Sequence, residues 1–217
     1  MDLFDALTPD ETPVPPAPGA VLLPGFARAD ADALIADAGS IAMRAAFRHL
    51  GTPGGAVMSV AMTNAGSLGW HSDRSGYRYV AADPLTGLPW PPIPATFLRI
   101  AASAAEAGGF PQFAPECVLI NRYEPGARLS LHQDRDEGDL DAPIVSVSLG
   151  LPAVFLFGGL RRDDPVRRFR LSHGDVAVWG GPARLAFHGI APLKPGIHPA
   201  TGACRLNLTF RRVSRLP

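Results

Sequence analysis

The sequence predicts an α+β fold in which two helices support a jelly-roll, a double-stranded β-helix core built from two packed sheets. Three observations indicate this fold. The helix-like segments precede residue 110, many short strand-like segments follow Pro115, and Gly and Pro are frequent, at 23 residues each among 217. Gly and Pro supply the turns that many short strands need. With 47% apolar and 18% charged residues, the chain has the material for a buried core and is not a disordered protein.

The chain divides into a short extension and one domain. Residues 1–19 are proline-rich, a composition that favours an extended path over the surface. Residues 20–217 have the length of a single domain, and no internal repeat subdivides them. No coiled-coil heptad is present in the sequence, so we expect a monomer.

Four features are expected before residue 115. An alanine-rich run at 27–47 has apolar residues near helical spacing, and 57–62 reads as a strand. A second helix is expected at 96–107, where two glycines close it. Between the expected strand and the second helix, 64–90 is a long loop rich in Gly, Pro and aromatic residues, with the capacity to form a hairpin. Loops of this length are usually functional or disordered, so we expect one of these two for this segment.

Strand-like segments follow one another from 115 to 212, which is the predicted jelly-roll core. Each is short, rich in branched or aromatic residues and bounded by turn residues. The expected strands are 117–123, 128–132, 144–149, 153–157, 166–171, 175–179, 184–188 and 204–212.

The uncharged stretch at 142–160 is long enough to resemble a transmembrane helix. Pro143, Pro152 and several glycines interrupt it, however, and 144–149 alternates with a period of two. Two core strands explain this pattern better than a membrane span, so no association with a membrane is expected.

Charge and cysteine content set further limits on function. The 20 basic and 20 acidic residues cancel, which gives no support to a globally basic nucleic-acid-binding protein. Two distant cysteines do not form a disulfide framework, and the N-terminus lacks the basic and apolar regions of a signal peptide. A cytoplasmic location is therefore expected.

The pattern His-x-Asp occurs three times, at His71, His132 and His173. On a strand, residues i and i+2 face the same side, so one pair could offer an imidazole and a carboxylate to one cation. A third ligand from a distant strand would complete the two-histidine, one-carboxylate set of non-haem Fe(II) oxygenases. The pair at His173 lies at a tight turn and that at His71 in the glycine-rich loop. The pair at His132 ends a strand, beside further acidic residues, and is either a metal site or a solvated acidic turn.

The last strand-like segment, 205–211, alternates strictly between polar and apolar residues. Its polar face carries Arg205, Asn207, Thr209 and Arg211, while Leu206, Leu208 and Phe210 lie on the other. A polar face in water is one interpretation. In a sandwich with a ligand cavity the polar face can instead point inward, where two guanidinium groups would bind carboxylates. Residues on the strand at 117–123 add a polar amide and a phenol to such a pocket.

A cluster of arginines between 161 and 170, interrupted by Asp163 and Asp164, forms a local positive region. It is either a solvated hairpin or, in a nucleic-acid enzyme, a track for phosphates. The sequence leaves both interpretations open.

Several of these segments together resemble the AlkB family, whose members are Fe(II)/2-oxoglutarate dioxygenases that repair alkylated nucleic acid. The similarity runs from about residue 20 to 212 and is of the bacterial AlkB type. The segments that carry it are 52–55, 58–64, 119–127, 129–137, 178–181 and 205–211.

The resemblance implies a role for particular residues. It identifies three iron ligands: His132, Asp134 and His188. It assigns five residues to 2-oxoglutarate, with Arg205 facing the distal carboxylate: Asn121, Tyr123, Arg205, Asn207 and Arg211. It places five residues at the substrate: Met62, Trp70, Tyr77, Asp136 and Arg162. Trp70 and His132 would sandwich a flipped base, Tyr77 would meet the phosphate backbone, and the 64–90 segment would be an aromatic nucleotide-recognition lid.

The activity implied is oxidative demethylation of N1-methyladenine and N3-methylcytosine, with Fe(II), 2-oxoglutarate and O2, and release of formaldehyde, succinate and CO2. The expected partner is alkylated single-stranded DNA, with double-stranded DNA and RNA left open. Because such a lesion pairs weakly, extruding it costs less than extruding a normal base. Two alternatives remain: a hydroxylase of this class that acts on a small molecule or protein, and a non-redox, cupin-like metal-binding protein.

Overall fold

The computed structural model describes residues 12–215, which form two α-helices, two short 3-10 helices and fourteen strands. The helices are α1 (Ala31–Arg44), α2 (Ala95–Ala107), η1 (Arg28–Asp30) and η2 (Gly181–Ala183). The strands of the first half are β1 (Val14–Ala17), β2 (Ala20–Leu23), β3 (Arg48–Gly51), β4 (Val57–Gly66), β5 (Gly69–Asp73), β6 (Gly76–Val80) and β7 (Cys117–Tyr123). Those of the second half are β8 (Leu129–His132), β9 (Ile144–Gly150), β10 (Ala153–Phe157), β11 (Arg167–Leu171), β12 (Val176–Trp179), β13 (His188–Ile190) and β14 (Arg205–Arg211).

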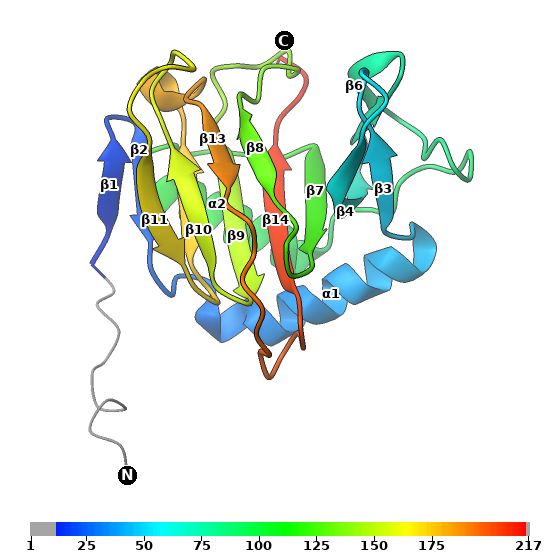
Figure 1. The fold of residues 1–217 in the computed structure, drawn as a ribbon, viewed down its shortest axis with the longest axis horizontal. Coiled ribbons are helices and arrows are strands. Elements are labelled where there is room, and N and C mark those ends of the chain that lie inside the picture. Colours follow the sequence, from blue (N-terminus) through cyan, green and yellow to red (C-terminus); the bar gives the residue numbers. More distant parts are fainter. Residues whose placement is uncertain (1–11, 216–217) are drawn as a thin grey trace.

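Two antiparallel sheets form the body of the molecule (Figure 1). The larger sheet has the order β1-β2-β12-β9-β14-β7-β4-β3, and the smaller sheet has the order β11-β10-β13-β8. Most neighbouring strands are distant in sequence, as in a jelly-roll, where hairpins fold back over one another. The predicted fold class is therefore confirmed.

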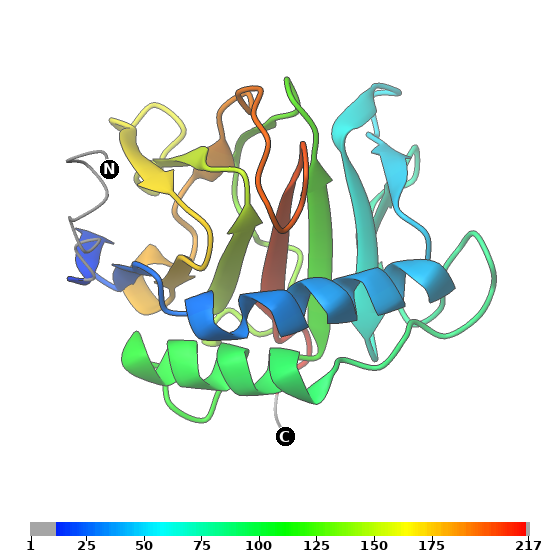
Figure 2. The same cartoon turned by 90° about the horizontal axis from the view of Figure 1, so that it is seen from below.

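The two helices cover one face of the larger sheet, and Figure 2 shows them together along one side of the molecule. Leu34 and Ile41 of α1 and Phe97 and Ile100 of α2 are buried at helical spacing. Phe97 packs edge-to-face on Phe210 of β14, with ring centroids 5.9 Å apart. Within residues 12–215, no helix combines the length and apolar character needed to cross a bilayer.

Strand β14 is buried on both faces, and its alternation positions the site. Leu206, Leu208 and Phe210 belong to the core beneath the helices. The intervening polar residues therefore point toward the smaller sheet. Of the two interpretations of this strand, the inward polar face is the one observed.

The structure refines two of the expected segments. The segment at 64–90 begins with the end of β4 and contains the two-stranded hairpin β5–β6, in agreement with its expected capacity to form a hairpin. The strand expected at 184–188 starts only at His188, because the chain before it turns through η2.

The proline-rich segment at 1–19 is described from residue 12 onward. Within it, β1 pairs with β2 at the edge of the larger sheet, so this part is held by sheet hydrogen bonds. Residues 1–11 lie outside the described part, and the domain boundary at residue 20 stays a prediction.

Candidate metal centre and cosubstrate pocket

Adjacent strands of the smaller sheet bring two histidines together. His132 ends β8, His188 begins β13, and the two residues are direct partners in the antiparallel register. Asp134 follows β8 and lies between them, with carboxylate oxygens 3.7 Å from His132 Nε2 and 3.8 Å from His188 Nε2. The three ligand atoms lie within 4.8 Å of one another. This is the two-histidine, one-carboxylate arrangement that leaves coordination positions open on Fe(II).

Backbone carbonyls orient both imidazole rings. The Nδ1 atom of His132 lies 2.8 Å from the Ser130 carbonyl oxygen, and that of His188 lies 3.0 Å from the Ala186 carbonyl oxygen. A carbonyl only accepts hydrogen bonds, so each Nδ1 carries the proton and each Nε2 presents its lone pair to the centre. Burial also lowers the pKa of His188 to about 4, so this ring is neutral at neutral pH.

Arg211 keeps Asp134 ionised. Its Nε and Nη2 atoms donate to Asp134 Oδ2 at 3.0 and 2.8 Å. Burial alone would raise the pKa of Asp134, but the adjacent Arg211 guanidinium and the two histidines together outweigh it and hold that pKa below its ordinary value. A deprotonated carboxylate is the form that binds a metal cation.

The polar faces of β7 and β14 form a buried polar cluster beside these residues, and we call this cluster the cosubstrate pocket. Tyr123 lies opposite Arg205, and Asn121 lies opposite Asn207, in the strand register. Arg205 is fully buried, and its guanidinium carbon stands 4.9 Å from the centre of the Tyr123 ring. The Arg205 Nη2 atom donates to Ser148 Oγ at 2.9 Å.

Several buried polar atoms in this pocket lack a partner. Among residues 12–215, the buried side-chain atoms without a hydrogen bond are Asn121 Oδ1, Trp179 Nε1, Arg205 Nε, Arg205 Nη1 and Arg211 Nη1. Four of these five atoms belong to residues assigned to 2-oxoglutarate from the sequence. Buried unpaired donors are costly, so their convergence indicates an anionic ligand.

The charges in the pocket specify the ligand further. Arg184 and Arg211 are buried but paired with carboxylates, whereas Arg205 has no carboxylate partner among the described residues. A dicarboxylate that places one end on Arg205 and the other near the metal and Arg211 satisfies the unpaired donors. The pocket therefore fits 2-oxoglutarate.

Two serines of β9 were not predicted from the sequence, although they support this pocket. Ser148 accepts from Arg205, and Ser146 Oγ accepts from Asn207 Nδ2 at 2.8 Å. Asn207 Oδ1 in turn accepts from Thr209 at 3.0 Å. The partners of Asn207 thus lie within the protein. The alternation of Ser146 and Ser148 in 144–149 was the signal that could have identified both serines.

A buried network around Glu137 was also missed. Glu137 accepts a hydrogen bond from the Tyr79 hydroxyl of β6 and lies 3.2 Å from Arg184 Nη2 and 3.4 Å from Arg211 Nε. Arg184 further donates to the backbone carbonyls of Asp134 at 2.6 Å and Ala142 at 2.9 Å. This guanidinium therefore ties the segment that carries Asp134 to the segment that leads into β13. Nothing in the sequence spacing distinguishes Arg184 from the many surface arginines.

Three of the residues assigned to the substrate are linked to one another, and one of them, Asp136, lies two residues after the candidate ligand Asp134. Trp70 and Tyr77, both of the β5–β6 hairpin, stack with centroids 5.6 Å apart and planes inclined by 15°. Trp70 Nε1 donates to Asp136 Oδ2 at 3.2 Å. Asn64 fixes the backbone of Trp70 through two hydrogen bonds of 3.0 Å. The hairpin thus presents aromatic surface next to the strand end that carries His132.

The other two residues assigned to the substrate are Arg162 and Met62. Arg162 Nη1 donates to the Leu131 carbonyl at 3.0 Å, and its guanidinium lies 4.8 Å from the centre of the Phe187 ring. Arg162 thus contacts Leu131 and Phe187, which directly precede the candidate ligands His132 and His188. Met62 is buried on β4, where it is the register partner of Asn121.

The two remaining His-x-Asp pairs form no such cluster among the described residues. Asp73 pairs with Arg78 at 2.6 Å, on the hairpin. His173 Nδ1 accepts from the Gly150 amide at 3.0 Å. Asp175 accepts from the amide of Ser172 in the same turn and from the amide of Gly25. Turn chemistry accounts for the pair at His173.

A jelly-roll with a His-Asp-His cluster beside a buried arginine pocket defines an Fe(II)- and 2-oxoglutarate-dependent dioxygenase. Residues 19–211 match the family model of the 2OG-Fe(II) oxygenase superfamily. The chain is 57% identical, over 99% of its length and 98% of the relative's, to the alpha-ketoglutarate-dependent dioxygenase AlkB of Salmonella typhimurium. This chain belongs to the AlkB family of Fe(II)/2-oxoglutarate dioxygenases.

More distant relatives agree with this assignment. The nucleic acid dioxygenase ALKBH1 of Mus musculus is 34% identical over 64% of this chain and 33% of its own length. The solved structure of OsALKBH1 superposes with a TM-score of 0.82, at 30% identity, and covers 93% of this chain and all of that one. The chain binds Fe(II) and 2-oxoglutarate, as this family does.

Replacing Arg205 separates cosubstrate binding from folding. The variant Arg205→Met removes the partner of one carboxylate, an effect of about 2–5 kcal/mol, or about 30- to 4,000-fold weaker binding of 2-oxoglutarate. Because Arg205 is an unpaired buried charge in the ligand-free protein, the same change should not lower the free energy of unfolding without ligand. Anaerobic 2-oxoglutarate titrations and urea unfolding measure the two effects.

The control for this experiment is Arg122→Met on the same strand pair. Arg122 is exposed and paired with Glu124, so its loss should leave 2-oxoglutarate affinity unchanged. Unaltered affinity in Arg205→Met would show that this guanidinium does not hold the cosubstrate.

Replacing Arg184 tests the support of the metal ligands. Arg184→Met frees the segment that carries Asp134, and loss of such outer contacts typically weakens metal binding about 10- to 100-fold. Competition titrations with Mn(II) or Fe(II) measure this effect. Arg212→Met, which breaks the ion pair with Asp139 elsewhere on the same segment, is the matched control. Equal metal affinity in both variants and the wild type would rule out the positioning role of Arg184.

Proposed function

We propose that this protein removes methyl groups oxidatively from N1-methyladenine and N3-methylcytosine in DNA. The observation that carries the proposal is the aromatic pair of Trp70 and Tyr77 held beside the candidate metal centre. Membership of the AlkB family supports the same activity, and a mouse relative bears the name nucleic acid dioxygenase. Neither alternative considered from the sequence is favoured by these findings.

His132, Asp134 and His188 would hold the iron, and their Nε2 and carboxylate atoms already face one another. Arg205 and Tyr123 would bind the distal carboxylate of 2-oxoglutarate. Arg211 would bind the carboxylate next to the keto group through its unpaired Nη1 atom. When bound, iron and 2-oxoglutarate would supply the power to oxidise an N-methyl group to a hydroxymethyl group with O2, releasing succinate and CO2. The hydroxymethyl amine is unstable and then loses formaldehyde.

Asn121 and Asn207 would act in different ways. Asn207 is occupied by neighbouring side chains and would orient Asn121. Asn121 Nδ2 donates one of its two hydrogens to Asn207 Oδ1 at 3.4 Å, and the other would be available to a carboxylate of the cosubstrate.

The residues around the hairpin suit a flipped, methylated base. Methylation at N1 of adenine or N3 of cytosine gives the base a positive charge, and the carboxylate of Asp136 complements that charge and accepts from the exocyclic amine. Trp70 and the partly exposed ring of His132 offer stacking surfaces, while Met62 closes the wall. The exposed hydroxyl of Tyr77 and the guanidinium of Arg162 would meet the sugar-phosphate backbone.

Single-stranded DNA is the proposed preferred substrate, since a base that is already unpaired enters the site without the cost of breaking a pair. Double-stranded DNA and RNA present the same base to the same hairpin and are secondary candidates. The proposal includes a monomer in the cytoplasm. Two free cysteines, one of them buried, are consistent with a reducing compartment.

The test is formaldehyde release from a single-stranded oligonucleotide that carries one N1-methyladenine or N3-methylcytosine. We expect release only with Fe(II), 2-oxoglutarate and O2, and with one succinate formed for each formaldehyde. His132→Ala should reduce it to background, whereas His173→Ala, from the His-x-Asp pair outside the cluster, should retain it. Turnover of 2-oxoglutarate without release of formaldehyde from either base would contradict this substrate assignment.

A further inference from the structure

The smaller sheet has an outer face that the candidate site does not use. In the register, His188 is the partner of Phe157, and both side chains are buried. One residue further along each strand, Gly189, Leu156 and Arg168 form the next row. Because side chains alternate across a strand, this second row faces away from the metal cluster. The outer face therefore begins directly behind the iron-binding strand.

This outer face is positively charged. The strands β8, β10, β11 and β13 contain three arginines, all on β11, and no aspartate or glutamate. Arg167 lies over the Phe169 ring and donates to the Pro16 carbonyl. Arg168 and Arg170 are exposed, and no hydrogen bond or ion pair to either guanidinium occurs among the described residues. We call Arg168 and Arg170 the outer arginine pair.

Some exposed arginines of this neutral chain are matched by acids. Arg99 pairs with Asp30 at 2.8 Å, and Arg161, in the turn before β11, pairs with Asp163 at 3.1 Å. The outer arginine pair has no such neutralising partner, so its charge is available to an external anion.

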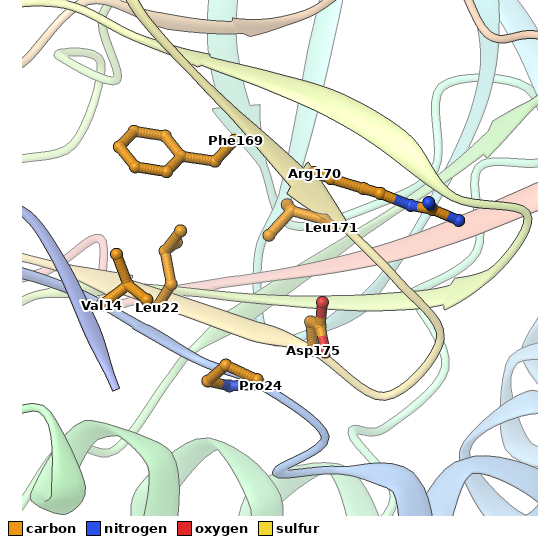
Figure 3. A pocket seen from close by; sticks show the side chains of 7 residues that line it. All are labelled: Val14, Leu22, Pro24, Phe169, Arg170, Leu171 and Asp175. Atoms are coloured by element: carbon orange, nitrogen blue, oxygen red, sulfur yellow. The ribbon is translucent and has the colours of Figure 1, made fainter. Parts of the chain in front are cut away.

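The guanidinium of Arg170 points away from the apolar residues of a nearby cavity. A small cavity of about 120 Å³ lies between β2, β11 and the turn before β12, lined mainly by apolar residues. Figure 3 shows the guanidinium of Arg170 extending away from Val14, Leu22 and Pro24, which line the same cavity. This leaves the guanidinium free at the surface.

The outer arginine pair is close to the rim of the site. Neighbouring strands lie about 4.8 Å apart, so β11 is about 10 Å from β13, two strands away. Arg162, in the turn that leads into β11, reaches the Leu131 carbonyl on β8 and the Phe187 ring just before β13. Arg168 and Arg170, two residues apart on one strand, are separated by about 7 Å, which is similar to the spacing of adjacent phosphates in an extended single strand.

We propose that the outer arginine pair binds successive phosphates of the single strand whose alkylated base enters the site, continuing from Arg162 over the edge of the smaller sheet. Arginine forks match phosphate geometry, and the partly exposed Val154 and Leu156 on the adjacent strand offer apolar contact to the sugars. This inference rests on the proposed function, which it extends from one nucleotide to the flanking strand.

The test compares Arg168→Gln/Arg170→Gln with Arg44→Gln/Arg99→Gln. The control pair removes the same charge from α1 and α2, on the opposite side of the larger sheet. Binding of methylated oligonucleotides of about 15 nucleotides is measured between about 50 and 200 mM salt, together with formaldehyde release from a methylated trinucleotide.

Each phosphate contact to a single strand contributes about 0.7 to the slope of log affinity against log salt, so the outer-pair variant should lose about 1.4 from that slope. Its affinity for the long strand should fall about tenfold at the lower salt, and its activity on the trinucleotide should equal that of the wild type. A slope and affinity equal to those of the control variant would overturn the proposal.

A methylated duplex and the trinucleotide separate the other outcomes. A larger loss on the duplex than on the single strand would contradict the single-strand assignment. A wild-type protein that binds the long strand through these arginines but releases no formaldehyde from any substrate would contradict the proposed function and leave the binding surface supported. A wild-type protein that binds no oligonucleotide would overturn both.

Discussion

The buried polar face of β14 is the constraint on which the site depends. Between two packed sheets, a guanidinium loses its water and must find an anion or remain costly. Arg211 meets this requirement inside the protein, with Asp134 and Glu137. Arg205 does not, and its Nε and Nη1 atoms stay unpaired. Catalytic pockets often accept such a cost in the ligand-free protein because the ligand removes it, and we propose that the missing partner here is the distal carboxylate of 2-oxoglutarate.

The same charges link separate parts of the fold. Glu137 joins Arg211 and Arg184 to the Tyr79 hydroxyl, and burial raises the pKa of Tyr79, so this hydroxyl remains a donor. The β5–β6 hairpin, which carries Trp70, is thereby attached to the carboxylate side of the metal centre. Neutral overall charge is compatible with this design, because acids and arginines are paired inside while the outer face of the smaller sheet keeps two arginines unpaired.

Much of the fold and of the candidate site could be predicted from the sequence, because strict alternation and short residue spacing indicate which side chains share a face of a strand. The polar face of 205–211 and the His-x-Asp pair at His132 are local patterns, and the resemblance to the AlkB family added His188. The supporting residues were not predictable. Arg184 and Glu137 reach the site only through tertiary folding, and Arg184 looks like any surface arginine in the sequence. The capacity of the 64–90 segment to form a hairpin was expected, but the exact strands were not, because they depend on close packing of Gly69 against Trp90 and on a tight turn with positive φ at Gly76.

The most direct test of the central claim is the visible charge-transfer band that an Fe(II)-bound 2-oxo acid gives without oxygen. We predict that 2-oxoglutarate produces the band at one equivalent of Fe(II), and that 2-oxobutyrate, which lacks the distal carboxylate, needs at least about 30-fold higher concentration, as expected for loss of one buried charge pair. If the two acids reached half of the full band at equal concentrations, the claim that Arg205 binds the distal carboxylate would be contradicted.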